Sequence, residues 1–149
     1  MSFLRLSFWY IYLPQSLIPA VCEPGWNKYM SSCYKYFNSQ RRWTDARGLC
    51  KNLNADLAKI TSSDVHDFVF RLGLHQPFDT WIGLRQQSPV SFVWTDGASV
   101  GQFTFWSDGE PASGNDVCAK MGRNDSHGRW RTGECTIAHN SYVCEKGLF

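Results

Sequence analysis

This sequence lacks three features, and each absence argues against a class of protein. No stretch reaches the roughly 20 consecutive apolar residues that a membrane-spanning helix needs, so we expect no membrane anchor. The net charge is only +2, which gives no reason to expect nucleic acid as a partner. No two cysteines have the C-x-x-C spacing of common zinc sites, and no internal repeat or low-complexity tract is present.

The first twenty residues differ from the rest of the chain. One arginine is followed by an apolar run at residues 6–13, and two prolines precede Ala20. This order is typical of a secretory signal peptide, so we predict a signal at residues 1–20 and one domain at residues 21–149. The alternative is an N-terminal tail, but the cysteines begin directly after Ala20, which favours export. We therefore expect a secreted, extracellular protein.

The six cysteines favour disulfide bonds over a metal site, because they are even in number and all follow the expected cleavage point. Six cysteines allow 15 connectivities, and spacing alone does not choose among them. Two pairs are close enough for short bridges, and the remaining two residues would close a long loop. Full pairing leaves no cysteine for an interchain bridge, so we expect a monomer or a non-covalent oligomer. The six are Cys22, Cys33, Cys50, Cys118, Cys135 and Cys144.

The central stretch of the chain is residues 80–84, Thr-Trp-Ile-Gly-Leu. A short apolar run of this kind predicts a fully buried strand. Its Gly83 predicts that another segment packs close against the backbone. Trp94, Trp106 and Trp130 follow, and aromatic residues make up 15% of the chain, so we expect a core rich in aromatic rings.

Two helices are predicted before most of the strands. Apolar residues recur at helical spacing over 46–53, with Thr44 as the expected N-cap, and again over 65–72, with Ser62 or Ser63 as the cap and Gly73 at C′. Strands are expected at 34–37, 92–94, 117–121, 129–131 and 142–145, with an extended link at 56–60 and a long aromatic-containing loop at about 96–116. This order predicts an α+β fold with mainly antiparallel sheets.

These motifs together resemble the C-type lectin-like domain in its six-cysteine form. The resemblance spans residues 22–144 and rests on Trp-Ile-Gly-Leu at 81–84, Phe-Val-Trp-Thr-Asp-Gly at 92–97, Trp-Ser-Asp-Gly-Glu-Pro at 106–111, and Trp130 followed by Cys135. It implies two helices flanking antiparallel sheets, with a long structured loop. It also implies a cis Glu110–Pro111 peptide and the pairs Cys22–Cys33, Cys50–Cys144 and Cys118–Cys135.

The resemblance also implies where a calcium ion would bind in a sugar-binding member, and this chain departs from that pattern. Calcium needs about 6–8 oxygen ligands, several of them charged. Of the positions matching the family's ligands, Glu110 keeps a carboxylate and Asp116 stands for a later one, but Ala112 offers no side-chain oxygen. Arg131 is a cation, and Thr132 is at best a weak neutral ligand.

The family's auxiliary calcium site is no better preserved. Its positions hold Gln86, Val90, Ser113 and Val117, none of them charged. We therefore expect no cofactor and no bound metal.

The candidate ligand-binding residues are Glu110, Asp116, Arg129 and Arg131. For the two carboxylates, we favour the alternative that they support the loop. Lys120, Arg123, Arg129 and Arg131 form either an anion-binding patch or an ordinary solvated face. As a hypothesis, Arg131 replaces the calcium charge by pairing with Glu110 or Asp116.

Asn124-Asp125-Ser126 matches the N-glycosylation pattern, and the sequence leaves open whether Asn124 is glycosylated or unmodified. No catalytic residues stand out, because the four histidines are scattered and none has an evident nucleophile partner.

We therefore expect a secreted, non-enzymatic recognition module that binds a protein or a glycan, anionic glycans included, without calcium at the usual site. The alternatives are a calcium-dependent lectin with a degenerate site and a structural protein of the extracellular matrix.

Overall fold

A computed structural model describes Pro14 and residues 20–148 of the chain. The predicted signal peptide therefore lies outside the described residues, apart from Pro14 and Ala20. Within the described part, no helix is long and apolar enough to cross a membrane.

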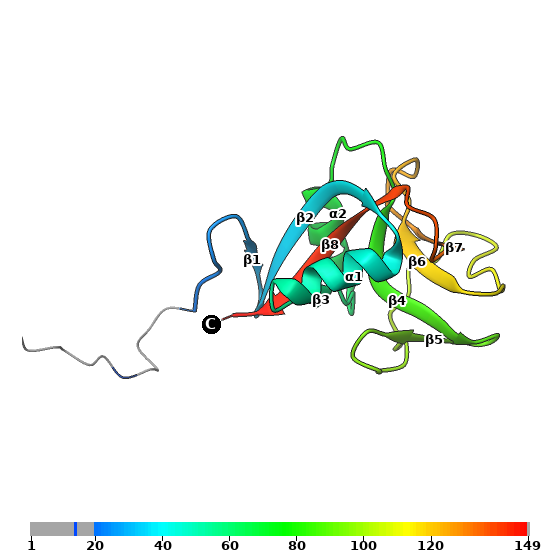
Figure 1. The fold of residues 1–149 in the computed structure, drawn as a ribbon, viewed down its shortest axis with the longest axis horizontal. Helices are drawn as coiled ribbons and strands as arrows, with labels where there is room; N and C mark the ends of the chain where they lie inside the picture. The colour runs from blue at the N-terminus through cyan, green and yellow to red at the C-terminus, as the bar shows by residue number, and fades with distance from the viewer. Residues whose placement is uncertain (1–13, 15–19, 149) are drawn as a thin grey trace, which may run out of the picture.

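The centre of the fold is one twisted sheet of eight strands (Figure 1). Six strands follow one another across it in the order β1-β2-β8-β4-β6-β7, while β3 pairs with β8 and β5 with β4. The strands are β1 (Asn27–Tyr29), β2 (Ser32–Arg41), β3 (Asp56–Leu57), β4 (Thr80–Ser88), β5 (Ser91–Trp94), β6 (Val117–Met121), β7 (Trp130–Glu134) and β8 (Asn140–Gly147).

The predicted α+β class is confirmed, with two differences in detail. The sheet is mixed rather than purely antiparallel, because β4 and β8 run parallel where Thr80 and Trp81 pair with Ser141 and Tyr142. The last hairpin strand was predicted at 129–131 but occupies Trp130–Glu134. Its pairing with β6 therefore extends to the end of the hairpin that holds the Cys118–Cys135 disulfide bond.

Helix α1 (Trp43–Asn52) begins earlier than predicted. Thr44 lies inside its first turn, and the N-cap is Arg42, which makes no side-chain capping hydrogen bond. The backbone N–H of Trp43 instead donates to the carbonyl of Cys135 at 3.0 Å. The buried indole of Trp43 also donates to the carbonyl of Ile82 at 2.9 Å. A tertiary contact thus sets the start of this helix where the local pattern favoured a polar cap.

Helix α2 (Ser63–Leu72) begins as predicted, because the Ser62 hydroxyl accepts a hydrogen bond from the backbone N–H of Val65. Its end differs from the prediction. Gly73 is the C-cap with φ of −104°, so it does not take the left-handed C′ conformation. A Cβ at Gly73 would lie 2.3 Å from the guanidinium of Arg123 and 2.6 Å from the ring of Tyr36, so lack of space explains the glycine here.

Residues 80–84 of strand β4 are buried on both faces, as the unbroken apolar run predicted. Trp81 packs with α1 in one core cluster, whereas Ile82 and Leu84 belong to a second cluster with α2 and the long loop. The expected close approach at Gly83 is confirmed. Its N–H donates to the carbonyl of Ala58 at 2.8 Å, and a Cβ would lie 2.6 Å from the carbonyl oxygen of Leu57.

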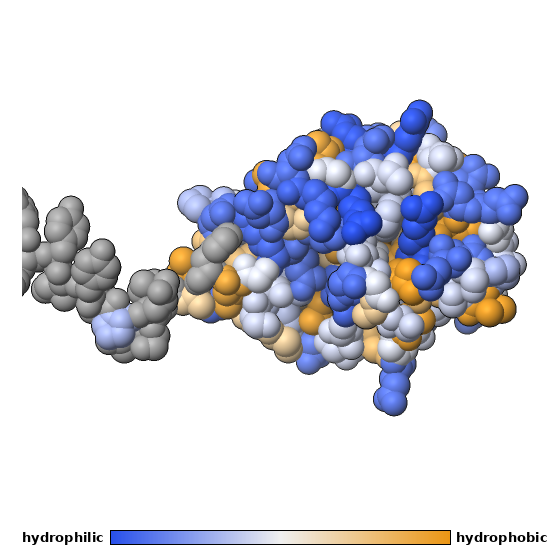
Figure 2. All heavy atoms as spheres, turned by 60° about the horizontal axis from the view of Figure 1, so that its bottom comes forward, coloured by the Kyte–Doolittle hydropathy of each residue, from blue (hydrophilic) through white to orange (hydrophobic). Residues whose placement is uncertain are grey.

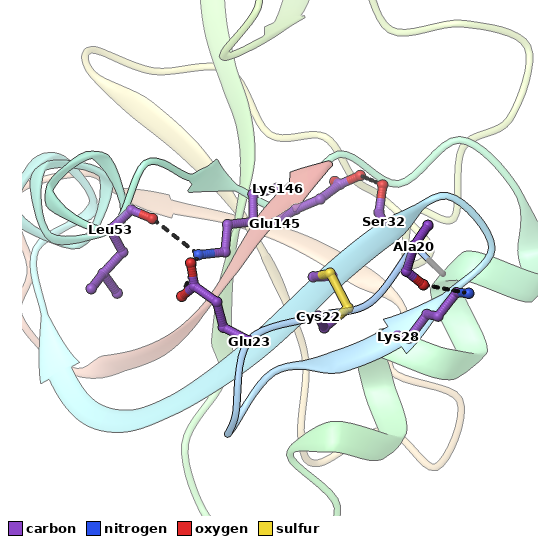
Figure 3. The surroundings of a disulfide bond; sticks show 9 residues. Ala20, Cys22, Glu23, Lys28, Ser32, Leu53, Glu145 and Lys146 are labelled. Atoms are coloured by element: carbon purple, nitrogen blue, oxygen red, sulfur yellow. Dashed lines mark hydrogen bonds and ion pairs between the residues drawn. A yellow bond between two sulfur atoms is a disulfide. The ribbon is translucent and has the colours of Figure 1, made fainter. Parts of the chain in front are cut away.

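The three disulfide bonds that the resemblance implied are present: Cys22–Cys33, Cys50–Cys144 and Cys118–Cys135. The second joins α1 to β8 across a sequence separation of 94 residues, and a loop of that length corresponds to about 4–5 kcal/mol in the chain-entropy model. Figure 3 shows the first bond beside the N-terminal segment. There, Glu23 pairs with the buried ammonium of Lys146 at 2.9 Å.

Replacing Trp81 with alanine should lower the free energy of unfolding by about 3–5 kcal/mol, the usual cost of deleting a fully buried large aromatic side chain. The indole is 0% exposed, and its N–H also donates to the carbonyl of Arg41 at 2.9 Å. Chemical denaturation measures the loss. Val90→Ala is the control, because Val90 is 95% exposed and its truncation should change stability by less than about 0.5 kcal/mol. Equal midpoints for both variants would contradict the central place of Trp81.

Candidate functional site

The long loop between β5 and β6 is held against β7 by aromatic packing around Trp130. The indole of Trp130 is 0% exposed and meets three other rings edge to face. The ring centroids lie 5.8 Å away for Trp94, 5.6 Å for Trp106 and 5.8 Å for Phe103. Trp106 and Phe103 belong to the loop and are partly buried against the core, as the aromatic content of the loop predicted.

The backbone of the loop also pairs with the outer edge of β7. Trp130 donates its N–H to the carbonyl of Phe105 at 2.6 Å, and its own carbonyl accepts from Ser107 at 2.9 Å. The other edge of β7 pairs with β6. Because β7 ends the strand order of the sheet, its outer backbone groups would otherwise lack a strand partner. The loop therefore serves as a short additional strand at Trp130.

Two residues further along β7, the carboxylate of Glu110 occupies the position of the next strand partner. Its Oε2 atom accepts the N–H of Thr132 at 3.2 Å, the hydroxyl of Thr132 at 2.6 Å and the N–H of Ala112 at 2.8 Å. Glu110 precedes Pro111 in a cis peptide, as the resemblance implied. One carboxylate oxygen thus joins the tip of the long loop to β7.

The second carboxylate, Asp116, is bound by a different strand. Its Oδ1 atom lies 2.5 Å from the guanidinium of Arg85 on β4, and its backbone carbonyl accepts from Cys135 at 3.1 Å. The Arg85 guanidinium also lies 5.6 Å from the ring centre of Trp43. Asp116 has φ of +56°, a left-handed conformation that aspartate adopts more readily than most residues. Glu110 and Asp116 are therefore held separately, Glu110 by hydrogen bonds that include β7 and Asp116 by an ion pair to β4.

The predicted ion pair between Arg131 and Glu110 or Asp116 is wrong. Thr132 binds the first carboxylate and Arg85 binds the second, so neither is left for Arg131. Alternation along β7 puts Thr132 on the buried side with Trp130 and turns Arg131 away to the exposed side. There its side chain lies over Gly122, where a Cβ would be 3.6 Å from Arg131 Nε.

Two of the four basic residues predicted to cluster late in the chain, Lys120 and Arg131, face each other as partners across β6 and β7. Lys120 pairs with Asp79 at 2.9 Å. Arg123 is partly buried and donates to the hydroxyl of Thr80 and to the carbonyl of Phe70. Arg129 makes only a long contact to Asp125, at 3.4 Å.

Arg131 makes no ion pair with any residue of the described chain. Arg129 and Arg131 thus remain as the exposed part of the expected patch. Their contact with a ligand, like that of Glu110 and Asp116, stays a prediction.

The residues at the family's calcium position do not fit that ion. The Glu110 oxygen is already bound by three donors, and the Thr132 hydroxyl points its proton at it. Asp116 is paired with a permanent cation. Within residues 20–148, no group of three or more His, Cys, Asp or Glu side chains is arranged to hold a metal ion. This donor set stabilises two isolated carboxylates rather than a divalent cation.

Sequence reasoning missed three residues of this region: Thr132, Arg85 and His66. Thr132 was judged only as a weak metal ligand, although alternation from Trp130 already placed it on the side facing the loop. Arg85 alternates with the buried Leu84, but no local signal joins it to a carboxylate 31 residues away. No sequence motif singled out His66.

His66 joins α2 to the same aromatic cluster. The imidazole is 1% exposed, accepts from the indole N–H of Trp130 at Nδ1, 3.1 Å away, and donates from Nε2 to the carbonyl of His127, 2.9 Å away. These contacts require the neutral ring protonated at Nε2, because a second ring proton would face the indole N–H. Burial lowers the pKa of His66 and outweighs the hydrogen bond to His127 and the nearby carboxylates of Asp67 and Asp125, while the charge of Arg123 lowers it further.

Stability should therefore fall as the pH drops below about 6.5, the ordinary pKa of histidine. Below that pH the unfolded chain binds a proton at His66 and the folded chain does not. The free energy of unfolding therefore falls by up to about 1.4 kcal/mol per pH unit, until the pH reaches the lowered pKa of His66 in the folded chain. Urea unfolding between pH 7.5 and pH 5 measures this slope. His66→Gln keeps a donor near the His127 carbonyl but does not titrate, so its slope should be flatter. Equal slopes in the two proteins would contradict this account.

Comparison with known proteins agrees with this geometry. The lectin C-type domain family matches residues 39–146. The secretory phospholipase A2 receptor of Oryctolagus cuniculus is 37% identical over 130 residues, which cover 84% of this chain but only 9% of the receptor.

Two solved structures share the fold. Herring type II antifreeze protein is 27% identical with a TM-score of 0.78, and the match covers 86% of this chain and 100% of that one. The carbohydrate-recognition domain of cow CD23, determined in the presence of an oligosaccharide, is 26% identical with a TM-score of 0.77, covering 88% and 99%. On this evidence, the chain belongs to the lectin C-type domain family.

Proposed function

We propose that the protein is a secreted, non-enzymatic recognition module that binds a protein surface or an anionic glycan without calcium at the long-loop site. The observation that carries this proposal is the binding of Glu110 by Thr132 and Ala112. The carboxylate that would coordinate calcium instead satisfies backbone and hydroxyl donors. The tip of the loop is thereby held against β7 by groups of the chain itself.

The relatives support both classes of ligand. The rabbit receptor is named for secretory phospholipase A2, a protein, and the cow CD23 domain was determined with an oligosaccharide. Because the matched segment is 9% of that receptor, its ligand supports only the class and not the identity. Proteins and glycans both present polar and charged groups to a binding partner. The face shown in Figure 2 is mainly polar, with apolar side chains in separate spots, and a surface of this kind can bind such groups.

Arg129 and Arg131 are the basic residues that we assign to ligand contact. They lie on the exposed side of the β7 segment, opposite the buried face of Trp130. Arg131 leaves its donors available to a ligand, since no described residue forms an ion pair with it. Arginine side chains bind sulfate and carboxylate groups through paired N–H donors, so this edge of the sheet suits an anionic partner.

The non-enzymatic assignment is supported by the position of the buried histidine. Both ring nitrogens of His66 are engaged, one by Trp130 and one by the carbonyl of His127. A general base needs a free nitrogen within hydrogen-bond reach of the proton that it removes. His66 is therefore a structural residue of the aromatic cluster.

The proposal is tested on an array of neutral glycans, sulfated glycans and acidic proteins, probed first in millimolar calcium and then in chelator. We expect binding to a sulfated or acidic probe to survive the chelator. It should fall at least tenfold when Arg129 and Arg131 are both replaced by serine, which corresponds to about 1.4 kcal/mol.

Lys28→Ser is the matched control, because it removes an exposed positive charge on β1, at the opposite end of the strand order from β7. Its binding should equal that of the original protein. Loss of all binding in chelator would contradict the proposal and favour a calcium-dependent lectin.

A further inference from the structure

The turn between β6 and β7 presents an asparagine to solvent within a glycosylation pattern. Asn124 and Ser126 are both exposed. Among the contacts within the described chain, the Asn124 amide has no hydrogen-bond partner, and the Ser126 hydroxyl contacts only the exposed ring of His127. Both groups that oligosaccharide transfer requires are therefore accessible on the folded surface.

Asn124-Asp125-Ser126 is the only Asn-x-Ser/Thr pattern in the 149 residues. Asp125 holds the turn in shape, because its carboxylate accepts the N–H of His127 at 2.9 Å and its carbonyl accepts the N–H of Gly128 at 3.0 Å. The pattern therefore lies in an ordered surface turn that projects beyond the paired strands.

The turn lines a hollow on the side of α2. One part, of about 430 Å³, is bounded by Leu74, Pro77 and Asn124. An adjoining part, of about 290 Å³, shares Phe70, Leu74 and Ser126 with it. Leu74 is 48% exposed, so an apolar side chain lies in the open directly beside the asparagine. Its surroundings combine apolar surface with amide, carboxylate and hydroxyl groups, which suits a sugar with one apolar face and several hydroxyls.

We propose that Asn124 carries an N-linked glycan and that its first sugars lie in this hollow against Leu74. In the transfer step, Asn124 Nδ2 bonds to C1 of the first sugar of a lipid-linked oligosaccharide. The C1–O bond to the lipid diphosphate breaks, and the amide proton lost by Asn124 ends on the released diphosphate. Attachment keeps the sugar at a high effective concentration beside the hollow, so weak contacts suffice to hold it there.

The glycan would be attached at the end of the β6–β7 hairpin that lies away from Asp116. Asp116 directly precedes β6, whereas the 122–129 turn joins β6 to β7 at the other end of the hairpin. Five residues of strand separate the two ends, a length of about 17 Å.

The test is secretion of the full chain from a eukaryotic cell, followed by glycosidase treatment and peptide mass spectrometry. We expect the glycosidase to remove mass and to convert Asn124 to aspartate. Asn124→Gln and Ser126→Ala should both abolish the modification. Ser126→Thr is the matched control and should retain it, because threonine also satisfies the pattern.

The position of the first sugars is tested by the melting temperature before and after deglycosylation. The original protein should lose melting temperature when the glycan is removed, and Leu74→Ala should lose clearly less. Val90→Ala removes an exposed apolar side chain elsewhere and should behave as the original protein does. An equal loss in all three proteins would overturn the seating of the sugars in the hollow.

The glycan at Asn124 requires the export that the proposed function assumes. Different experimental results would contradict the glycan and the proposed function. An exported, disulfide-bonded protein with an unmodified Asn124 would overturn the glycan alone. A chain that stays inside the cell with reduced cysteines would overturn both.

Discussion

The outer edge of β7 needs hydrogen-bond partners, and the arrangement of the long loop follows from that need. An edge strand of a sheet presents unpaired N–H and carbonyl groups, which are costly to bury without partners. The loop supplies its backbone at Trp130 and the Glu110 carboxylate at Thr132. Trp130 then gathers the aromatic rings of the loop and the imidazole of His66 around its indole. Loop, edge strand and α2 thus form one connected unit.

The same constraint decides the role of Glu110. The Oε2 atom that closes the strand edge is less available to a metal, because it is already bound by three donors. With Asp116 held separately by Arg85, the two acids need no shared cation between them. The chain itself therefore supplies the contacts that fasten the loop, and the exposed arginine side of β7 is the surface that we propose for a ligand.

Local patterns and the family resemblance together made most of the fold predictable. The buried run around Gly83 and the apolar spacing of the two helices each reflect a constraint visible in a short window, whereas the disulfide pairs were implied by the family resemblance. The start of α1 was missed because Trp43 binds the carbonyl of Cys135, a partner far along the chain. The partners of Glu110 and Asp116 were missed for the same reason. Charge suggested Arg131 for them, whereas strand alternation turns that side chain away and brings Thr132 inward.

The most direct test of the central claim is a calcium titration of the isotope-labelled protein, followed through the backbone amide signals of Ala112 and Thr132. Both N–H groups donate to the same Glu110 oxygen, so a metal at that oxygen would change both signals. We predict no change up to millimolar calcium. The double variant Arg131→Asn with Thr132→Asp, which restores two ligand types, should respond. Saturable shifts of both signals in the original protein, reversed by chelator, would contradict the claim that the chain alone fastens its loop.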